Sequence, residues 1–190
     1  MAATLSKAEP SASRSEASEG PLLPAGEAAA GFLGPIGIAM AAAGLIKNPW
    51  HTALVRADRT GAALATILAR TRLDRLILIG HSRGGRVMIG AAEALATSPT
   101  APQIEEMHLL GTARGRKGDW SMLGSAVTGT VNNYHSLSDG VLTYAYTAAM
   151  VGSTAVGLAG FQTDIPNITD HNVSTDVAGH TEYFDEMTLL

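Results

Sequence analysis

The sequence predicts an α/β protein with a mostly parallel sheet, and three observations support this prediction. Short apolar strand patterns alternate with helical patterns along most of the chain. One of these strands ends in a glycine-flanked serine turn that leads directly into a helix. The chain has 190 residues, of which 46% are hydrophobic, so it can form one domain with a sizeable core. An alternating order of this kind places helices on both faces of the sheet, as three layers.

The strand–turn–helix unit at residues 76–87 is the most informative stretch. An apolar strand ends in Gly-His-Ser-Arg-Gly at 80–84, and a helix is expected from about 84 to 97. This pattern is typical of a nucleophile elbow, in which a strained turn lifts the Ser82 hydroxyl clear of the sheet. Gly80 and Gly84 are predicted to fit where a Cβ atom would clash with neighbouring backbone. The positive end of the helix would face Ser82.

The chain begins with two segments of contrasting composition. Residues 1–26 are dominated by Ser, Ala, Glu and Pro and are expected to be a disordered tail, without a secretory signal. Residues 27–190 are expected to form one domain, which opens with an apolar segment at 27–46 that is uncharged over 28–46. We favour a buried or lid-like hairpin there, because its proline and glycines suit a membrane-spanning helix poorly. Contact with a membrane surface through 28–46 is the alternative, and the expected location is cytoplasmic.

The remaining elements follow from hydrophobic periodicity and from turn signals. Asn-Pro-Trp at 48–50 indicates the start of a helix, and Ser-Pro-Thr-Ala-Pro at 98–102 indicates a loop. The expected helices cover 51–72, 119–127, 141–151 and a short stretch near the end of the chain. The expected strands after the serine turn cover 107–110, 130–135 and 167–173.

Charge and composition exclude several classes of protein. The net charge of −4 argues against general nucleic-acid binding, and the absence of cysteine excludes a disulfide framework or a cysteine nucleophile. The charge is uneven: residues 47–117 carry eleven Lys and Arg against five acids, whereas 118–190 carry eight acids and no Lys or Arg. We expect the two halves to pack together and partly neutralise each other. A basic face directed at an anionic lipid or a phosphate-bearing substrate is the sharper alternative.

A serine nucleophile needs a base, and the base needs an acid that orients it. In α/β-hydrolase order, these partners follow the serine on loops at the carboxyl ends of later strands, first the acid and then the histidine. Asp139 follows the expected strand at 130–135, and His180 lies beyond the last strand. The predicted set is therefore Ser82 as nucleophile, His180 as general base and acid, and Asp139 as the residue that orients it.

Other acids and histidines remain rivals for these roles. His171 also lies late in the chain, and His81 adjoins the serine, although its side chain is expected to point away from it. The rival acids are Asp164, Asp170 and Asp176. Surface or packing roles are expected for His51, His108 and His135. The histidine spacing suits no metal site, and no cofactor is predicted.

An oxyanion hole requires two donors. One is expected to be the backbone N–H of Arg83, the residue after the serine. The second normally comes from a loop after an earlier strand, but nothing before residue 76 has a strand pattern except, at best, 34–38.

The chain resembles the α/β-hydrolase superfamily and, within it, the group known as domain of unknown function 726, which includes transmembrane and coiled-coil domain proteins. The resemblance covers about residues 31–187 and depends on several motifs that occur in order. These are Asn-Pro-Trp at 48–50, Leu-Ile-Gly-His-Ser-Arg-Gly-Gly-Arg-Val at 78–87, Leu-Leu-Gly at 109–111, Val-Asn-Asn-Tyr at 131–134 with Ser-Asp-Gly-Val-Leu at 138–142, Gly-Leu-Ala-Gly at 157–160 and Val-Ala-Gly-His at 177–180. The resemblance implies a serine-hydrolase fold with Ser82, Asp139 and His180 as its triad, and the hydrolysis of a carboxylic or lipid ester is the analogy.

The chain departs from that group in two respects. Members usually carry Leu where Arg83 stands, and they have strands upstream of the apolar segment. Without such a strand, the edge of the strand before Ser82 would be exposed. Residues 28–46, a second copy or another chain could cover this edge. Otherwise the chain would be a catalytically incomplete scaffold that binds a lipid or a protein, and an acyltransferase or thioesterase is a third reading.

Overall fold

The computed structural model describes residues 49–186 and residue 189. The predictions for the tail at 1–26, for the apolar segment at 27–46 and for a strand at 34–38 therefore lie outside the described residues. None of the helices in residues 49–186 is long and apolar enough to cross a membrane.

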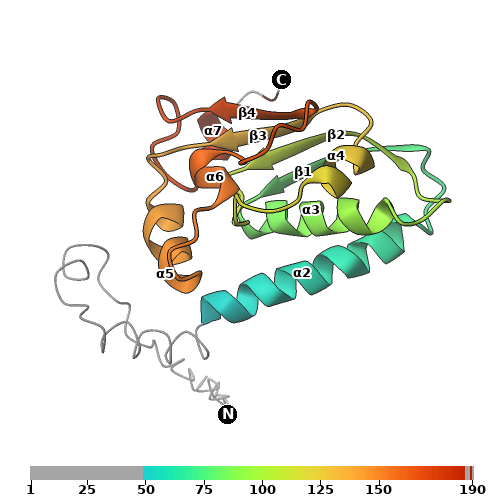
Figure 1. The fold of residues 1–190 in the computed structure, drawn as a ribbon, viewed down its shortest axis with the longest axis horizontal. Helices are drawn as coiled ribbons and strands as arrows, with labels where there is room; N and C mark the ends of the chain where they lie inside the picture. The colour runs from blue at the N-terminus through green and yellow to red at the C-terminus, as the bar shows by residue number, and fades with distance from the viewer. Residues whose placement is uncertain (1–48, 187–188, 190) are drawn as a thin grey trace, which may run out of the picture.

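The centre of the fold is a parallel sheet in the spatial order β1-β2-β3-β4 (Figure 1). Its strands are β1 (Arg75–His81), β2 (Gln103–Leu110), β3 (Val131–His135) and β4 (Ile168–Asn172). All three strand pairs are parallel, so the carboxyl ends of the four strands lie at one edge. The predicted α/β fold with a parallel sheet is confirmed.

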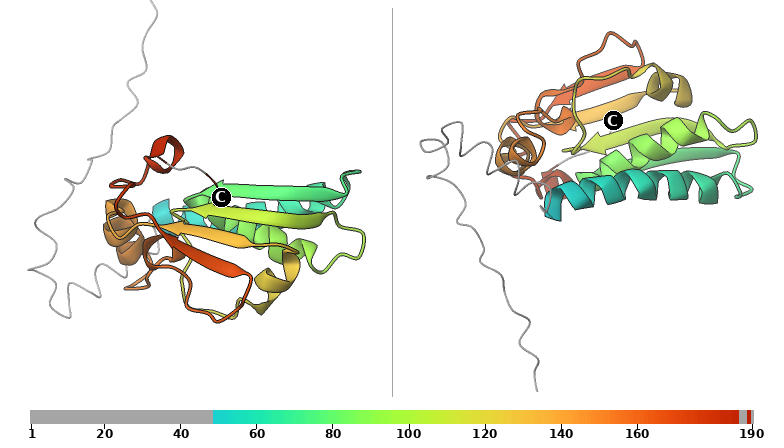
Figure 2. Two further views of the ribbon diagram at one scale, coloured as in Figure 1. Left: turned by 90° about the horizontal axis from the view of Figure 1, so that it is seen from above. Right: turned by 60° about the horizontal axis from the view of Figure 1, so that its bottom comes forward.

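One face of the sheet is covered by helices (Figure 2). α3 (Arg83–Leu95) packs on the sheet, and α2 (Pro49–Leu68) and α4 (Ser121–Ala126) pack against α3. A Cβ atom on Gly61 of α2 would lie 2.8 Å from the Val87 carbonyl oxygen of α3, so glycine allows the two helices to approach closely. The core between α3 and the sheet includes Leu78, Ile89, Met107, Leu109, Leu123 and Val131.

The opposite face is covered mainly near the carboxyl ends of the strands. There the segment after β4, which includes α7 (Tyr183–Glu186), buries a second apolar cluster: Leu110, Tyr134, Val173, Val177 and Tyr183. Farther along β1, the side chains of Ile77 and Ile79 are 55% and 50% exposed. Within residues 49–186, this face therefore has less cover than the face that carries α3.

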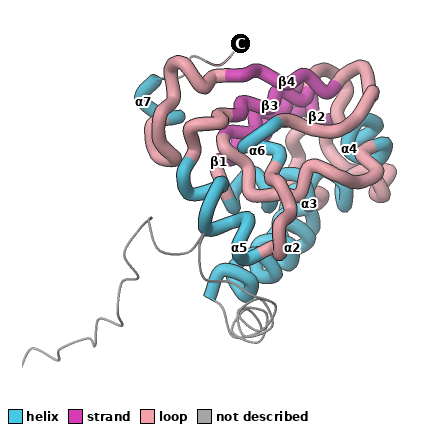
Figure 3. Tube along the Cα trace, turned by 60° about the vertical axis from the view of Figure 1, so that its left-hand side comes forward, coloured by secondary structure: helices cyan, strands magenta, loops and turns pink. Residues whose placement is uncertain are grey.

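Short helices and loops gather at the carboxyl edge of the sheet (Figure 3). They include α6 (Val156–Ala159) and the π-helical turn η1 (Val141–Tyr146), which continues into α5 (Thr147–Ala149). The sequence predicted one regular helix over 141–151 and did not predict α6. It also placed the start of β2 four residues too late and the end of α2 at residue 72 rather than at Leu68.

Candidate active site

Three loops at the carboxyl edge bring together the predicted residues of the site. Ser82 follows β1, Asp139 follows β3, and His180 lies between β4 and α7. The His180 Nε2 atom is 2.8 Å from the Ser82 Oγ atom, and the His180 Nδ1 atom is 2.6 Å from the Asp139 Oδ2 atom. The three side chains thus form one continuous hydrogen-bonded chain across 98 positions of sequence.

The backbone at Ser82 has the strain expected of a sharp strand-to-helix turn. Ser82 has φ of 55° and ψ of −119°, and it is one of two non-glycine residues with positive φ in the described chain. Its N–H donates to the Leu110 carbonyl at 2.9 Å, and its own carbonyl accepts from the Ala113 N–H at 3.0 Å. These bonds to the last residue of β2 and to the loop after it hold the turn in a conformation that a free chain would rarely adopt.

The glycines around the turn differ from the prediction in one case. A Cβ atom on Gly80 would lie 2.7 Å from the Gly85 Cα atom, as expected for a close crossing of backbone. The same prediction for Gly84 is wrong, because a Cβ atom there would meet nothing within 4 Å. Gly85 is the second glycine that packing requires, because a Cβ atom on it would overlap the Thr112 side chain. The helix of the elbow therefore contacts the neighbouring strand end through Gly85, one residue later than predicted.

Asp139 is fully buried and has a partner for each carboxylate oxygen. Its Oδ1 atom accepts the Leu142 N–H at 3.0 Å, from the first turn of η1, while Oδ2 faces His180. Its own N–H donates to the Ser136 carbonyl at 3.2 Å. The Ser136 hydroxyl in turn donates to the Val177 carbonyl at 2.6 Å. The loop that carries Asp139 and the loop that carries His180 are thus joined directly.

The two contacts of His180 define one tautomer. Because the Asp139 carboxylate only accepts, the proton of a neutral ring lies on Nδ1, and the Nε2 lone pair faces the Ser82 hydroxyl. The side chain of His180 is 12% exposed. The Glu182 carboxylate fixes the preceding backbone by accepting the N–H groups of Ala178 and Gly179 at 2.7 and 3.0 Å. This arrangement can remove a proton from a serine hydroxyl.

His81 contacts the loop that carries His180, which the sequence did not predict. Its Nε2–H group donates to the His180 carbonyl at 2.7 Å, and the two rings lie 4.8 Å apart. The ring also contacts Tyr183 and Phe184 of α7. Burial lowers the pKa of His81, so its neutral form is favoured. The only sequence signal was its position beside Ser82, which on its own could not show that the ring would meet the His180 loop.

The rival residues lie elsewhere. The His171 Nε2 atom is 3.0 Å from the Asn132 Oδ1 atom, and its ring stacks on Tyr134 at 4.9 Å. The Asp170 carboxylate accepts the Phe161 N–H and the Asn133 amide, and so serves the packing of β3. The carboxylate that bonds His180 is that of Asp139, and not that of Asp164 or Asp176. Of the other histidines, His51 is exposed on α2, His108 lies within 3.2 Å of the Tyr134 hydroxyl, and burial lowers the pKa of His135.

An ion-pair network joins α2, α3 and the loop after β2, and the sequence did not predict it. Arg86 of α3 is 9% exposed and forms two bonds to the Asp58 carboxylate of α2, at 2.7 and 2.8 Å. Arg114 approaches the same carboxylate at 3.2 Å. In residues 49–186, every arginine salt bridge lies within the arginine-rich half of the chain. The expected neutralisation between the two halves is therefore not made by direct arginine–carboxylate pairs in this range.

The N–H group that is predicted to be the oxyanion donor lies at the N-terminus of a helix. Arg83 is the first residue of α3, and the first N–H groups of a helix have no acceptor within it. β1 is an edge strand of the described sheet, with α2 as the element before it. A second donor from an earlier strand would therefore have to come from outside residues 49–186.

Within residues 49–186, no group of three or more His, Asp or Glu residues is arranged to hold a metal ion.

Comparison with known proteins places the chain in a family. Residues 29–190 match the model of a protein family that is described as a protein of unknown function (DUF726), and the chain belongs to that family. It is 34% identical over 151 residues to an uncharacterized membrane protein, C6F6.13c, of Schizosaccharomyces pombe, and 32% identical over 149 residues to the transmembrane and coiled-coil domain-containing protein STS1 of Oryza sativa. It is also 34% identical over 150 residues to a probable lipase, MIL1, of Saccharomyces cerevisiae.

These similarities cover most of this chain but little of the relatives. The matched regions are 77%, 76% and 77% of this chain, and 19%, 22% and 14% of the respective relatives. The chain therefore spans about a fifth or less of the length of the curated relatives that it matches. No solved structure matches the chain. The fold and the family are established, and the similarity to a protein named as a probable lipase is consistent with a hydrolase.

Proposed function

We propose that the protein is a serine hydrolase that cleaves a carboxylic ester, of the lipid-ester type, through an acyl-enzyme. The observation that carries the proposal is the hydrogen-bonded chain from Ser82 through His180 to the buried Asp139. Each contact has the length and the donor–acceptor order that a serine nucleophile requires. The similarity to a protein named as a probable lipase supports the same class of reaction.

The reaction would proceed in two halves. The Ser82 oxygen attacks the ester carbonyl carbon while His180 Nε2 takes the hydroxyl proton, and the carbonyl oxygen becomes an oxyanion beside the Arg83 N–H. Collapse of this intermediate breaks the bond to the alcohol, which leaves with the proton from His180. Water then attacks the acyl-Ser82 ester with the same histidine as base, which releases the carboxylic acid and restores the serine. Asp139 keeps the ring in its Nδ1–H tautomer throughout.

Labelling of the full chain with a neutral fluorophosphonate probe tests this proposal. We expect labelling of the wild type and none of Ser82→Ala or His180→Ala, because the probe reacts with a serine that a base has activated. Ser125→Ala is the matched control: Ser125 is exposed on α4, and its hydroxyl contacts only the Met122 carbonyl at 2.9 Å. Labelling that persists in Ser82→Ala would remove Ser82 from the mechanism.

The position of β1 at the edge of the described sheet favours a second candidate function. An edge that no strand of residues 49–186 covers suits a hydrolase-like scaffold that binds a lipid or a protein partner without turnover. The same edge could be covered by a second copy of the chain. Absence of labelling in the folded wild type would favour this alternative, and light scattering would then show whether copies associate.

A further inference from the structure

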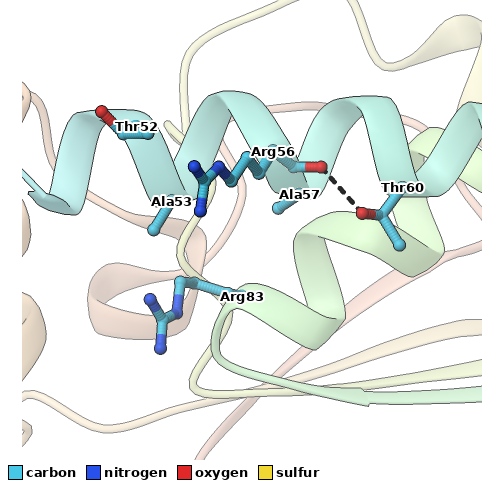
Figure 4. A pocket seen from close by; sticks show the side chains of 6 residues that line it. All are labelled: Thr52, Ala53, Arg56, Ala57, Thr60 and Arg83. Carbon is cyan, nitrogen blue, oxygen red and sulfur yellow. Dashed lines mark hydrogen bonds between the residues drawn. The ribbon is translucent and has the colours of Figure 1, made fainter.

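A cavity of about 560 Å³ opens between α2 and the start of α3, directly beside the elbow (Figure 4). Its lining comprises Thr52, Ala53, Arg56, Ala57, Thr60 and Arg83. The cavity is wide open to solvent, and its volume falls within the range of small-molecule sites. Figure 4 shows the Arg56 side chain lying along α2 and the Arg83 side chain extending from the start of α3, and both line the cavity, so it has two permanent positive charges at its wall.

Neither of these charges is neutralised by a carboxylate in residues 49–186. The nearest acid along α2 is Asp58, whose carboxylate is already bound by Arg86 and Arg114. The Arg83 guanidinium lies 5.6 Å from the centroid of the Trp50 ring. A contact of this kind orients a cation without cancelling its charge. The cavity is therefore a site of positive potential that favours an anion.

The hydrogen-bond donors of the cavity also fit an oxyanion group. The Thr60 hydroxyl donates to the Arg56 carbonyl at 2.8 Å, so its proton is in use. The two guanidinium groups and the Thr52 hydroxyl remain as donors. Guanidinium groups present parallel N–H pairs that match phosphate and carboxylate oxygens.

The cavity adjoins the reacting centre through a single residue. Arg83 follows Ser82, and its backbone N–H is the donor that we assign to the oxyanion, whereas its side chain lines the cavity. Arg83 thus belongs to both the elbow and the cavity.

We propose that this cavity binds a phosphate group of the substrate, so that the enzyme prefers acyl esters that carry phosphate on the alcohol side over neutral esters of the same acyl chain. This inference builds on the proposed hydrolase function. The cavity would recognise the substrate, whereas Ser82, His180 and Asp139 would carry out the hydrolysis.

The test compares two esters that differ only in the phosphate. The full chain is assayed with octanoylglycerol phosphate and with monooctanoylglycerol, both as monomers in solution. We expect kcat/KM to be about tenfold higher for the phosphate ester, mainly through a lower KM. The preference should shrink when salt is raised from about 50 to about 500 mM.

Three variants locate the effect. In Arg56→Gln/Arg83→Gln the ratio of the two kcat/KM values should fall to about one. Arg56→Lys should retain part of the preference, because the charge stays while the paired N–H donors are lost. Arg70→Gln is the control: it removes the same charge from an exposed residue just beyond the far end of α2 and should leave the ratio unchanged. Equal rates for both esters in the wild type, or an unchanged ratio in the double variant, would overturn the inference.

Two further readouts separate the possible failures. Inorganic phosphate and glycerol 3-phosphate are titrated calorimetrically into wild type and double variant, and we expect glycerol 3-phosphate binding that the double variant lacks. If neither ester is turned over, this binding decides the inference, while fluorophosphonate labelling of Ser82 independently decides the proposed function. Binding of inorganic phosphate without any preference between the esters would mark a site for free phosphate and contradict the substrate role.

Discussion

The change Asp139→Asn tests how the site controls the protonation of its histidine. Asp139 is fully buried, and Asn has nearly the same shape, so the amide oxygen can keep the bond from the Leu142 N–H. The amide NH₂ group then takes the place of the carboxylate oxygen that lies 2.6 Å from His180 Nδ1. An NH₂ group only donates there, so the ring must accept at Nδ1 and carry its proton on Nε2.

In that tautomer, His180 has no lone pair to receive the proton of Ser82. We therefore expect kcat/KM for a short-chain p-nitrophenyl ester to fall by about 10⁴, which corresponds to about 5.5 kcal/mol of transition-state stabilisation. The fold should persist, since the contact to η1 is retained, and thermal unfolding followed by circular dichroism checks this.

Asp176→Asn is the matched control. Asp176 is exposed in the loop after β4 that leads to His180, and the same change there should leave kcat/KM within about twofold of the wild type. A rate in Asp139→Asn close to that of the wild type, in a folded protein, would refute the assignment of Asp139 as the residue that orients His180.

Three further predictions concern stability. Asp58→Asn should lower the free energy of unfolding by about 2 kcal/mol in urea titrations, because it leaves the 11% exposed side chain of Arg86 without its anion; an unchanged denaturation midpoint would contradict this. Gly80→Ala should cost about 2 kcal/mol, since its Cβ atom would lie 2.7 Å from the backbone of α3, and a melting temperature equal to that of the wild type would show that the turn can relax. Burial lowers the pKa of His81 and His135 from 6.5, so the free energy of unfolding is highest above that pH, where both rings are neutral, and it declines as the pH falls below it. In His81→Gln, the decline in the free energy of unfolding between about pH 7 and pH 5 should be smaller. An identical decline in wild type and variant would exclude His81 as a contributor.

The sequence was most informative where a local pattern and its packing agree. The strand before Ser82 and the helix after it are both apolar on the side that faces the core, so their order and the turn between them could be predicted. The proximity of Asp139 and His180 could be predicted because parallel strands place their carboxyl ends at one edge. The close approach at Gly85 rather than at Gly84 could not, because it depends on Thr112 of another loop.

The missed elements are those that long-range contacts determine. The first half of β2 carries Glu105 and Glu106 at half-buried positions, so its polar pattern hid the start of the strand. η1 is a π-helical turn, which no sequence period predicts, and the hydroxyl of Thr147, the first residue of α5, donates back to the Leu142 carbonyl of η1 at 3.2 Å. α6 has only four residues, too few to show a helical period.

The contacts of His81 and the cavity between α2 and α3 were also not predicted, because both depend on residues that are far apart in the sequence. The cavity joins residues of two helices, and His81 meets a backbone carbonyl 99 positions away. Neither arrangement leaves a mark in the local sequence.

The proposed nucleophile is tested most directly by peptide mass spectrometry, which identifies the residue that a fluorophosphonate probe modifies in the intact wild-type chain. We expect a single adduct on the peptide that contains Ser82, formed at a rate that falls to background in His180→Ala. An adduct on any other serine, or no adduct on a folded chain, would contradict the claim that Ser82, His180 and Asp139 form a working nucleophile.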